Sequence, residues 1–182
     1  RFSFSYAGPW EGFAELAATL RQDQALPAHA HRLVLETLSD CAAALDDPHE
    51  PLIEDYFIYT VETFGEPVEA KSLLGDNRAA LVSLMMAELQ TLGMEEQTEA
   101  LRYHYSYFSS DLVVVLWDSA FIYENSEDAE VIEDILEFAN SQLVEFRTYD
   151  ARLDAELDAI YAMDVPSHSA ARPLGRRAAD IR

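Results

Sequence analysis

The sequence predicts an α+β fold: an antiparallel sheet of about four strands packed with helices, followed by one long helix. Two patterns carry this prediction. Apolar residues recur in steps of three and four in some stretches, and aromatic and β-branched residues alternate with polar ones in others. The chain has 182 residues and is 49% hydrophobic, which is enough for one globular domain with a buried core.

The first half is expected to contain mainly helices. Proline residues suit the start of a helix, and the aromatic and β-branched stretch IEDYFIYTVETF suits a strand. In chain order, we expect a helix from Pro9, a second helix from Pro27 to about Leu45, a strand over 53–64, a helical turn over 69–74 and a helix over 77–92 closed by Gly93.

The second half is expected to form a meander and then the long helix. Tyrosines alternate with polar residues over 101–108, and the stretch from Leu112 to Trp117 is nearly all apolar. Asp118 follows as the first residue of a turn, since its side chain can accept a backbone hydrogen bond two residues on. A last strand over 120–123 completes the meander.

The long helix is expected over 126–162. Ser126 can cap it, and neither Gly nor Pro interrupts it before Pro166. A helix of this length measures about 55 Å, whereas a compact chain of this size is about 40 Å across, so we expect the helix to overhang its domain. Its apolar seam is Ile132, Ile135, Ala139, Leu143, Phe146, Tyr149, Leu153, Leu157 and Ile160.

The half from Val131 to Phe146 is expected to lie on the meander, which leaves the stretch from Tyr149 to Ile160 without a partner. We therefore expect self-association through the long helix. The candidate interface is Leu143, Phe146, Arg147, Tyr149, Asp150, Leu153, Leu157 and Ile160. Its polar members fit a network that fixes register between helices, although a plain surface charge pattern explains them as well.

The charge balance limits the possible partners. The chain has 34 acidic and 12 basic residues, a net charge of −22. Nucleic acid and anionic membranes are disfavoured, because binding them needs clustered Lys and Arg. Either a high-salt source or a role in binding cations or a basic partner protein would explain the acidity.

Cys41 is the only cysteine in the sequence, so no intrachain disulfide forms and a reducing compartment is expected. Its Ala-rich surroundings indicate a small buried residue. Residues 1–163 are expected to form a single domain. The basic stretch 164–182, which contains Pro, Gly and Ser, is expected to be a linker to a missing C-terminal half.

Two segments resemble a known family: LRYHYSYFSSDLVVVLWDSAFIYE at 101–124 and LEFANSQLVEFRTYDARLDAEL at 136–157. They are similar to uncharacterised bacterial membrane-anchored proteins distantly related to the required-for-meiotic-nuclear-division, or YagE-like, proteins. The resemblance implies a soluble N-terminal domain on the cytoplasmic side, then a coiled-coil-like helical segment, then a C-terminal membrane anchor. It implies no catalytic residues.

The alternative function is an acidic-site enzyme or a sensor that binds a small ligand or divalent cation, using Asp118, Glu137 and Asn140. No phosphate loop, metalloprotease motif or nucleophile elbow occurs in the sequence, and the long helix has no histidine to complete a metal site. The sequence therefore predicts no cofactor and no metal, and it favours a non-enzymatic scaffold or adaptor domain.

Overall fold

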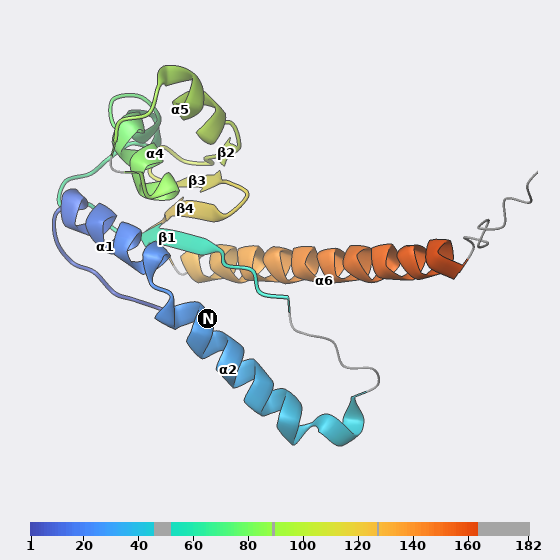
Figure 1. Cartoon of the computed structure of the whole chain (residues 1–182). Coiled ribbons are helices and arrows are strands. Elements are labelled where there is room, and N and C mark those ends of the chain that lie inside the picture. Colours follow the sequence, from blue (N-terminus) through green and yellow to red (C-terminus); the bar gives the residue numbers. More distant parts are fainter. Residues whose placement is uncertain (46–51, 89, 127, 164–182) are drawn as a thin grey trace, which may run out of the picture. The chain divides into compact units, whose positions relative to one another are not determined.

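The computed structural model describes residues 1–45, 52–88, 90–126 and 128–163, and it has an α+β fold (Figure 1). Contacts within the chain divide it into two compact units, unit 1 (Arg1–Val144) and unit 2 (Glu145–Arg182). The elements are α1 (Trp10–Gln22), α2 (Ala25–Asp40), the 3₁₀ turn η1 (Ala42–Ala44), β1 (Phe57–Val61), α3 (Ala70–Leu74), α4 (Arg78–Met86), α5 (Met94–Ala100), β2 (His104–Tyr105), β3 (Leu112–Val115), β4 (Ser119–Tyr123) and α6 (Asp128–Met163).

The sheet has four strands in the order β1-β4-β3-β2, as Figure 1 shows. The meander β2–β3–β4 is antiparallel, as predicted. The prediction was wrong for β1, which pairs with β4 in parallel and places Tyr59 opposite Phe121. Parallel neighbours need a long crossover, and here the crossover contains α3, α4 and α5. The sheet is therefore mixed.

The core of unit 1 lies between one face of this sheet and helices α1 and α4. Leu112, Val114 and Phe121 are fully buried on the sheet side, and Leu81 and Leu84 are fully buried on the α4 side. Each large apolar side chain buried in this way contributes about 1.5–3 kcal/mol to folding. The alternation of inward and outward residues in β3 follows the two-residue period of a strand.

The opposite face of the sheet is also covered where β1 and β4 lie. Ala120 and Ile122 point to this side and have no exposed surface. Thr60 shares that side, and its hydroxyl donates a hydrogen bond to Glu133 of α6. All five residues of β4 are therefore buried, which suits a central strand with helices on both faces.

Two local predictions were wrong around α4. The helix ends at Met86, because Ala87 adopts a left-handed conformation with φ of 49°, a common way to end a helix. Gly93 does not close α4; it precedes α5, a helix that the sequence pattern did not reveal, and its φ is −64°. The strands are also shorter than predicted, since only His104 and Tyr105 pair in β2.

The prediction of a buried Cys41 was wrong as well. Cys41 follows the last residue of α2 and is exposed. No residue of α2 is buried, and Leu33, Val34 and Leu35 are each between 43% and 45% exposed. The predicted helix to about Leu45 is also shorter than expected, since α2 ends at Asp40 and Ala42–Ala44 form only a 3₁₀ turn.

None of the helices in the described ranges combines the length and the apolar character needed to cross a membrane. The predicted linker over 164–182 lies outside the described residues.

Candidate functional site

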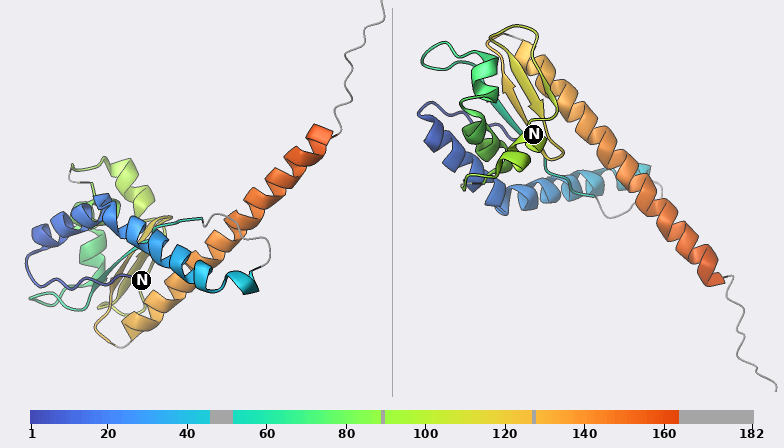
Figure 2. Two further views of the ribbon diagram at one scale, coloured as in Figure 1. Left: turned by 60° about the horizontal axis from the view of Figure 1, so that its bottom comes forward. Right: turned by 90° about the horizontal axis from the view of Figure 1, so that it is seen from above.

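Helix α6 carries most of the residues that the sequence analysis singled out, and Figure 2 shows it as one unbroken helix. Its start agrees with the predicted cap, because the Ser126 hydroxyl accepts a hydrogen bond from the Asp128 backbone N–H at 3.1 Å. Asp128 and Glu130 lie in the first turn, where the helix dipole favours negative charge.

The face of α6 that is covered within unit 1 differs from the predicted seam. Buried and half-buried positions follow one another in steps of three and four, which is the spacing of a single helix face. They are Ala129, Ile132, Leu136, Asn140 and Val144, with Glu133 beside them. The predicted seam members Ile135, Ala139 and Phe146 are exposed instead. The prediction that Val131–Phe146 packs on the sheet through that seam was therefore wrong in its choice of face.

A second row of residues on α6, here named the outer stripe, is largely apolar. Its steps are 4, 3 and 4, so equivalent positions recur every 11 residues. An 11-residue repeat gives about 3.67 residues per turn, so it keeps to one side of a nearly straight helix. The stripe is Val131, Ile135, Phe138, Gln142, Phe146, Tyr149, Leu153, Leu157 and Ile160.

The side chains of the outer stripe are solvent-exposed, except for the half-buried Gln142. Phe138 is 66% exposed, Phe146 64% and Leu153 57%. Contiguous exposed apolar rows are uncommon on protein surfaces, so this row is a candidate binding surface. Val131, Phe138 and Gln142 were absent from the predicted seam, although a usable signal existed: Gln142 lies 11 residues from both Val131 and Leu153, and Phe138 lies 11 residues from Tyr149.

The candidate interface residues mostly fall on or beside this stripe. Phe146, Tyr149, Leu153, Leu157 and Ile160 belong to it. Leu143, 40% exposed, lies between the stripe and the covered face. Asp150 is exposed and flanks the stripe, whereas the exposed Arg147 follows Leu136 by 11 residues and lies on the side of the covered face. The Tyr149 hydroxyl donates to the Glu145 carboxylate at 3.2 Å.

Asp118, the first residue of the alternative acidic site, lies in a network of polar contacts within unit 1. Asp118 forms an ion pair with Arg21 of α1, and it also accepts a hydrogen bond from the Ser119 hydroxyl at 3.3 Å. Arg21 in turn donates to the Met85 carbonyl at 2.9 Å. This carboxylate is neutralised by a neighbouring cation, so its contacts are those of a structural anchor between α1, α4 and the β3–β4 turn.

Glu137 and Asn140 are not seen beside Asp118. Glu137 pairs with Arg1, whose guanidinium nitrogen lies 3.6 Å from its carboxylate, and Arg1 also pairs with Glu133 and Asp134. Asn140 lies on the covered face of α6. In the described part of the chain, no three His, Cys, Asp or Glu side chains are grouped to hold a metal ion.

Two tyrosines line the Arg21–Asp118 pair. Burial, reinforced by the negative charge of Asp118, raises the pKa of Tyr56 to about 12. The Tyr56 hydroxyl donates to the carbonyls of Ser119 at 2.9 Å and Leu116 at 3.2 Å. Burial likewise raises the pKa of Tyr59, although the positive charge of Arg21 partly opposes this effect. Both phenols therefore stay neutral at physiological pH.

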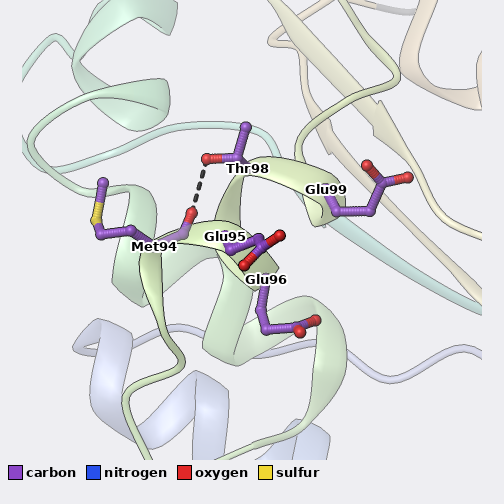
Figure 3. A pocket seen from close by; sticks show the side chains of 5 residues that line it. All are labelled: Met94, Glu95, Glu96, Thr98 and Glu99. Atoms are coloured by element: carbon purple, nitrogen blue, oxygen red, sulfur yellow. Dashed lines mark hydrogen bonds between the residues drawn. The ribbon is translucent and has the colours of Figure 1, made fainter.

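The hollow on α5 does not have the groups expected of a catalytic or ligand-binding site. A shallow hollow on α5 is lined by Met94, Glu95, Glu96, Thr98 and Glu99, and in Figure 3 the Thr98 hydroxyl bonds the Met94 carbonyl at 2.7 Å. Its polar groups are solvated carboxylates with no opposing cation or histidine among the lining residues.

Several aromatic residues near β2 and β3 are exposed. Tyr103 and Tyr105 are 55% and 64% exposed, and Trp117 is 78% exposed. These side chains therefore lie outside the core of unit 1.

The fold and the site together define an α+β domain whose most prominent surface feature is a long helix with an exposed apolar stripe. The chain belongs to the family described as "Uncharacterized protein MJ0711, N-terminal domain", whose model matches residues 1–130. The matched region includes the whole sheet and the start of α6.

A relative in Methanocaldococcus jannaschii, named "Uncharacterized protein MJ0711", is 25% identical over 104 residues. This match covers 57% of the present chain and 31% of the relative, so the chain spans only part of the relative's length. No solved structure matches the chain. Neither match is to the YagE-like proteins, so the comparisons do not support that resemblance, and the membrane anchor it implied stays a prediction.

Proposed function

We propose that this domain is a non-catalytic, self-associating scaffold module, and that a second copy of the chain covers the outer stripe of α6. The observation that carries the proposal is the exposed row Phe146, Tyr149, Leu153, Leu157 and Ile160 in unit 2. Their spacing is that of one helix face, and burying such a face against another helix releases water from apolar surface.

The size of this surface sets the expected affinity. The outer stripe runs from Val131 to Ile160, so it is about 45 Å long, and a face about 10 Å wide gives about 450 Å² per copy. The two copies would together bury about 900 Å², just below the lower limit for a specific protein interface. Self-association is therefore expected to be weak, with a dissociation constant of about 1–100 μM.

The charge of α6 sets the expected salt dependence. The helix contains ten acidic residues and two arginines, so its net charge is 2 − 10 = −8. Two such helices repel each other, and added salt screens this repulsion. Self-association should therefore strengthen with salt, whereas binding to a basic partner protein would weaken.

Light scattering or sedimentation of the purified chain from about 1 to about 100 μM, at low and high salt, tests the proposal. We expect the mean mass to rise with concentration and with salt. Leu153→Glu should abolish the rise, because it places a charge within the apolar row. Ala155→Glu is the matched control, because Ala155 is exposed on the opposite face of the same helix. A monomer throughout the range would refute the proposal. Equal effects of the two variants would show that the outer stripe is not the surface through which the copies associate.

A further inference from the structure

We propose that the uncovered half of the sheet in unit 1 is the surface that receives the outer stripe of a second copy. This inference rests on the proposed function and adds the place where the stripe binds. The part of the stripe that lies in unit 2 is here named the arm. It consists of Phe146, Tyr149, Leu153, Leu157 and Ile160.

The face of the sheet opposite α1 and α4 is covered on one half only. Residues directly opposite one another in neighbouring strands point to the same side of a sheet. One such row crosses all four strands, from β1 to β2: Thr60, Ile122, Val113 and Tyr105. Ile122 has no exposed surface, Val113 is half-buried and Tyr105 is 64% exposed. The cover over β1 and β4 therefore ends at β3.

The uncovered half has the width of one helix. Neighbouring strands lie about 4.8 Å apart, so β3 and β2 form a strip about 10 Å wide, and an α-helix is about 10 Å across. The strip is apolar and aromatic along its length. Val115 is half-buried and Tyr103 is 55% exposed, and the Val115 N–H donates to the Tyr103 carbonyl at 2.9 Å. A second helix can therefore lie beside α6 on this strip.

Helix α6 turns an apolar side toward the same strip. Glu133 accepts a hydrogen bond from Thr60 of β1, so that side of α6 faces the β1 edge of the sheet. Successive helix residues turn by about 100°, which places Ile135 and Ala139 on the other side, toward β3. Both are exposed. Together these residues form what is here named the docking face: Tyr103, Tyr105, Val113, Val115, Ile135 and Ala139.

The buried area favours a second copy over an unrelated helix. The covered row of α6 from Ala129 to Asn140 is about 16 Å long, and a docked helix contacts two surfaces, each about 10 Å wide. One contact buries about 320 Å² on each partner, about 640 Å² in total, which is too little for a specific interface. Two copies that exchange arms make the contact twice and bury about 1,300 Å², within the range of specific interfaces.

The charges permit this contact between two acidic chains. The whole chain has a net charge of −22, yet none of the six residues of the docking face is charged. The arm belongs to a stretch, Glu145 to Met163, with five acidic residues and two arginines, a net charge of 2 − 5 = −3. Docking places this stretch against an uncharged surface, where like-charge repulsion is smaller than at an acidic one.

A substitution in the docking face separates this inference from the proposed function. Tyr105→Glu should weaken self-association at least about tenfold, because it places a charge in the apolar strip. Met94→Glu is the matched control, because Met94 is also 64% exposed but lies on α5, which packs on α4. Circular dichroism checks that both variants keep the helix content of the wild type.

The outcomes distinguish the two proposals. If Leu153→Glu abolishes association and Tyr105→Glu acts no more strongly than Met94→Glu, the docking face is wrong and the proposed function stands. A wild-type chain that stays monomeric refutes both.

Disulfide trapping gives an independent readout of the contact. In a Cys41→Ser background, Tyr105→Cys is introduced into one protein, and Leu153→Cys or Leu157→Cys into another. After mild oxidation of equal mixtures, at least one arm cysteine should give about tenfold more mixed disulfide with Tyr105→Cys than with Met94→Cys, since the bond needs nearby Cβ atoms. No enrichment over Met94→Cys, or self-linked arms as the main product, in a protein that light scattering shows to be a dimer, would overturn the inference.

Discussion

The ion pair between Arg21 and Asp118 is predicted to contribute strongly to the stability of unit 1. Asp118→Asn keeps the shape of the side chain and removes its charge, which leaves the guanidinium of Arg21 without its carboxylate. Removing one partner of a fully buried ion pair costs about 3–5 kcal/mol. The two side chains are 13% and 23% exposed, and the Met85 carbonyl and the Phe57 ring still contact Arg21. Partial solvation reduces the expected loss to about 2 kcal/mol.

Urea unfolding followed by tryptophan fluorescence measures this loss. A loss of about 2 kcal/mol corresponds to a fall of about 4–8 °C in the melting temperature of a chain of this size. Glu96→Gln on α5 is the control, because this exposed carboxylate should change stability by less than about 0.5 kcal/mol. The double variant with Arg21→Met should lose less than the sum of the single variants. If Asp118→Asn leaves the stability unchanged or raises it, the carboxylate is not a structural anchor, and the acidic-site alternative gains support.

Three further outcomes are expected. The pKa of Tyr56 is raised from 10.0 to about 12. The stability gained by keeping the Tyr56 phenol neutral is therefore complete below pH 10 and is lost as the pH rises toward 12. The difference in urea midpoint between the wild type and Tyr56→Phe should shrink over that range. Leu136→Ala should lower the free energy of unfolding by about 1–2 kcal/mol and Phe138→Ala by less than about 0.5 kcal/mol, since only Leu136 lies on the covered face of α6. Similar losses for the two variants in urea unfolding would contradict the assignment of Leu136 to the covered face. Ala87→Gly should raise the melting temperature, because glycine adopts the left-handed conformation at φ of 49° without strain, worth about 0.5–1 kcal/mol; a lower melting temperature would contradict it.

The sequence was a sound guide to elements with a long, regular pattern. The start and length of α6 followed from a serine cap and an uninterrupted helical period. The meander followed from alternating residues and the turn at Asp118, and the α+β class followed from both. Each of these features is local, since a cap, a period or a turn depends on residues a few positions apart.

Features that depend on distant residues could not be read in the same way. The parallel pairing of β1 with β4 is set by how the crossover through α3, α4 and α5 packs, and no local pattern records that choice. The pairing of Arg21 with Asp118 joins residues far apart in the sequence. The sequence predicted a turn at Asp118, but no local pattern could show that Arg21 is its partner.

The long helix shows this division within one element. Its sequence determined that it is a helix and that it carries more apolar residues than one face of a helix needs. Two rows were available, and the period alone does not say which row meets the sheet. The tertiary structure decided this, because Ala129, Ile132 and Leu136 are buried or half-buried, whereas Ile135 and Phe138 stay exposed. Close packing selects the face whose shape fits, and hydrophobicity alone does not.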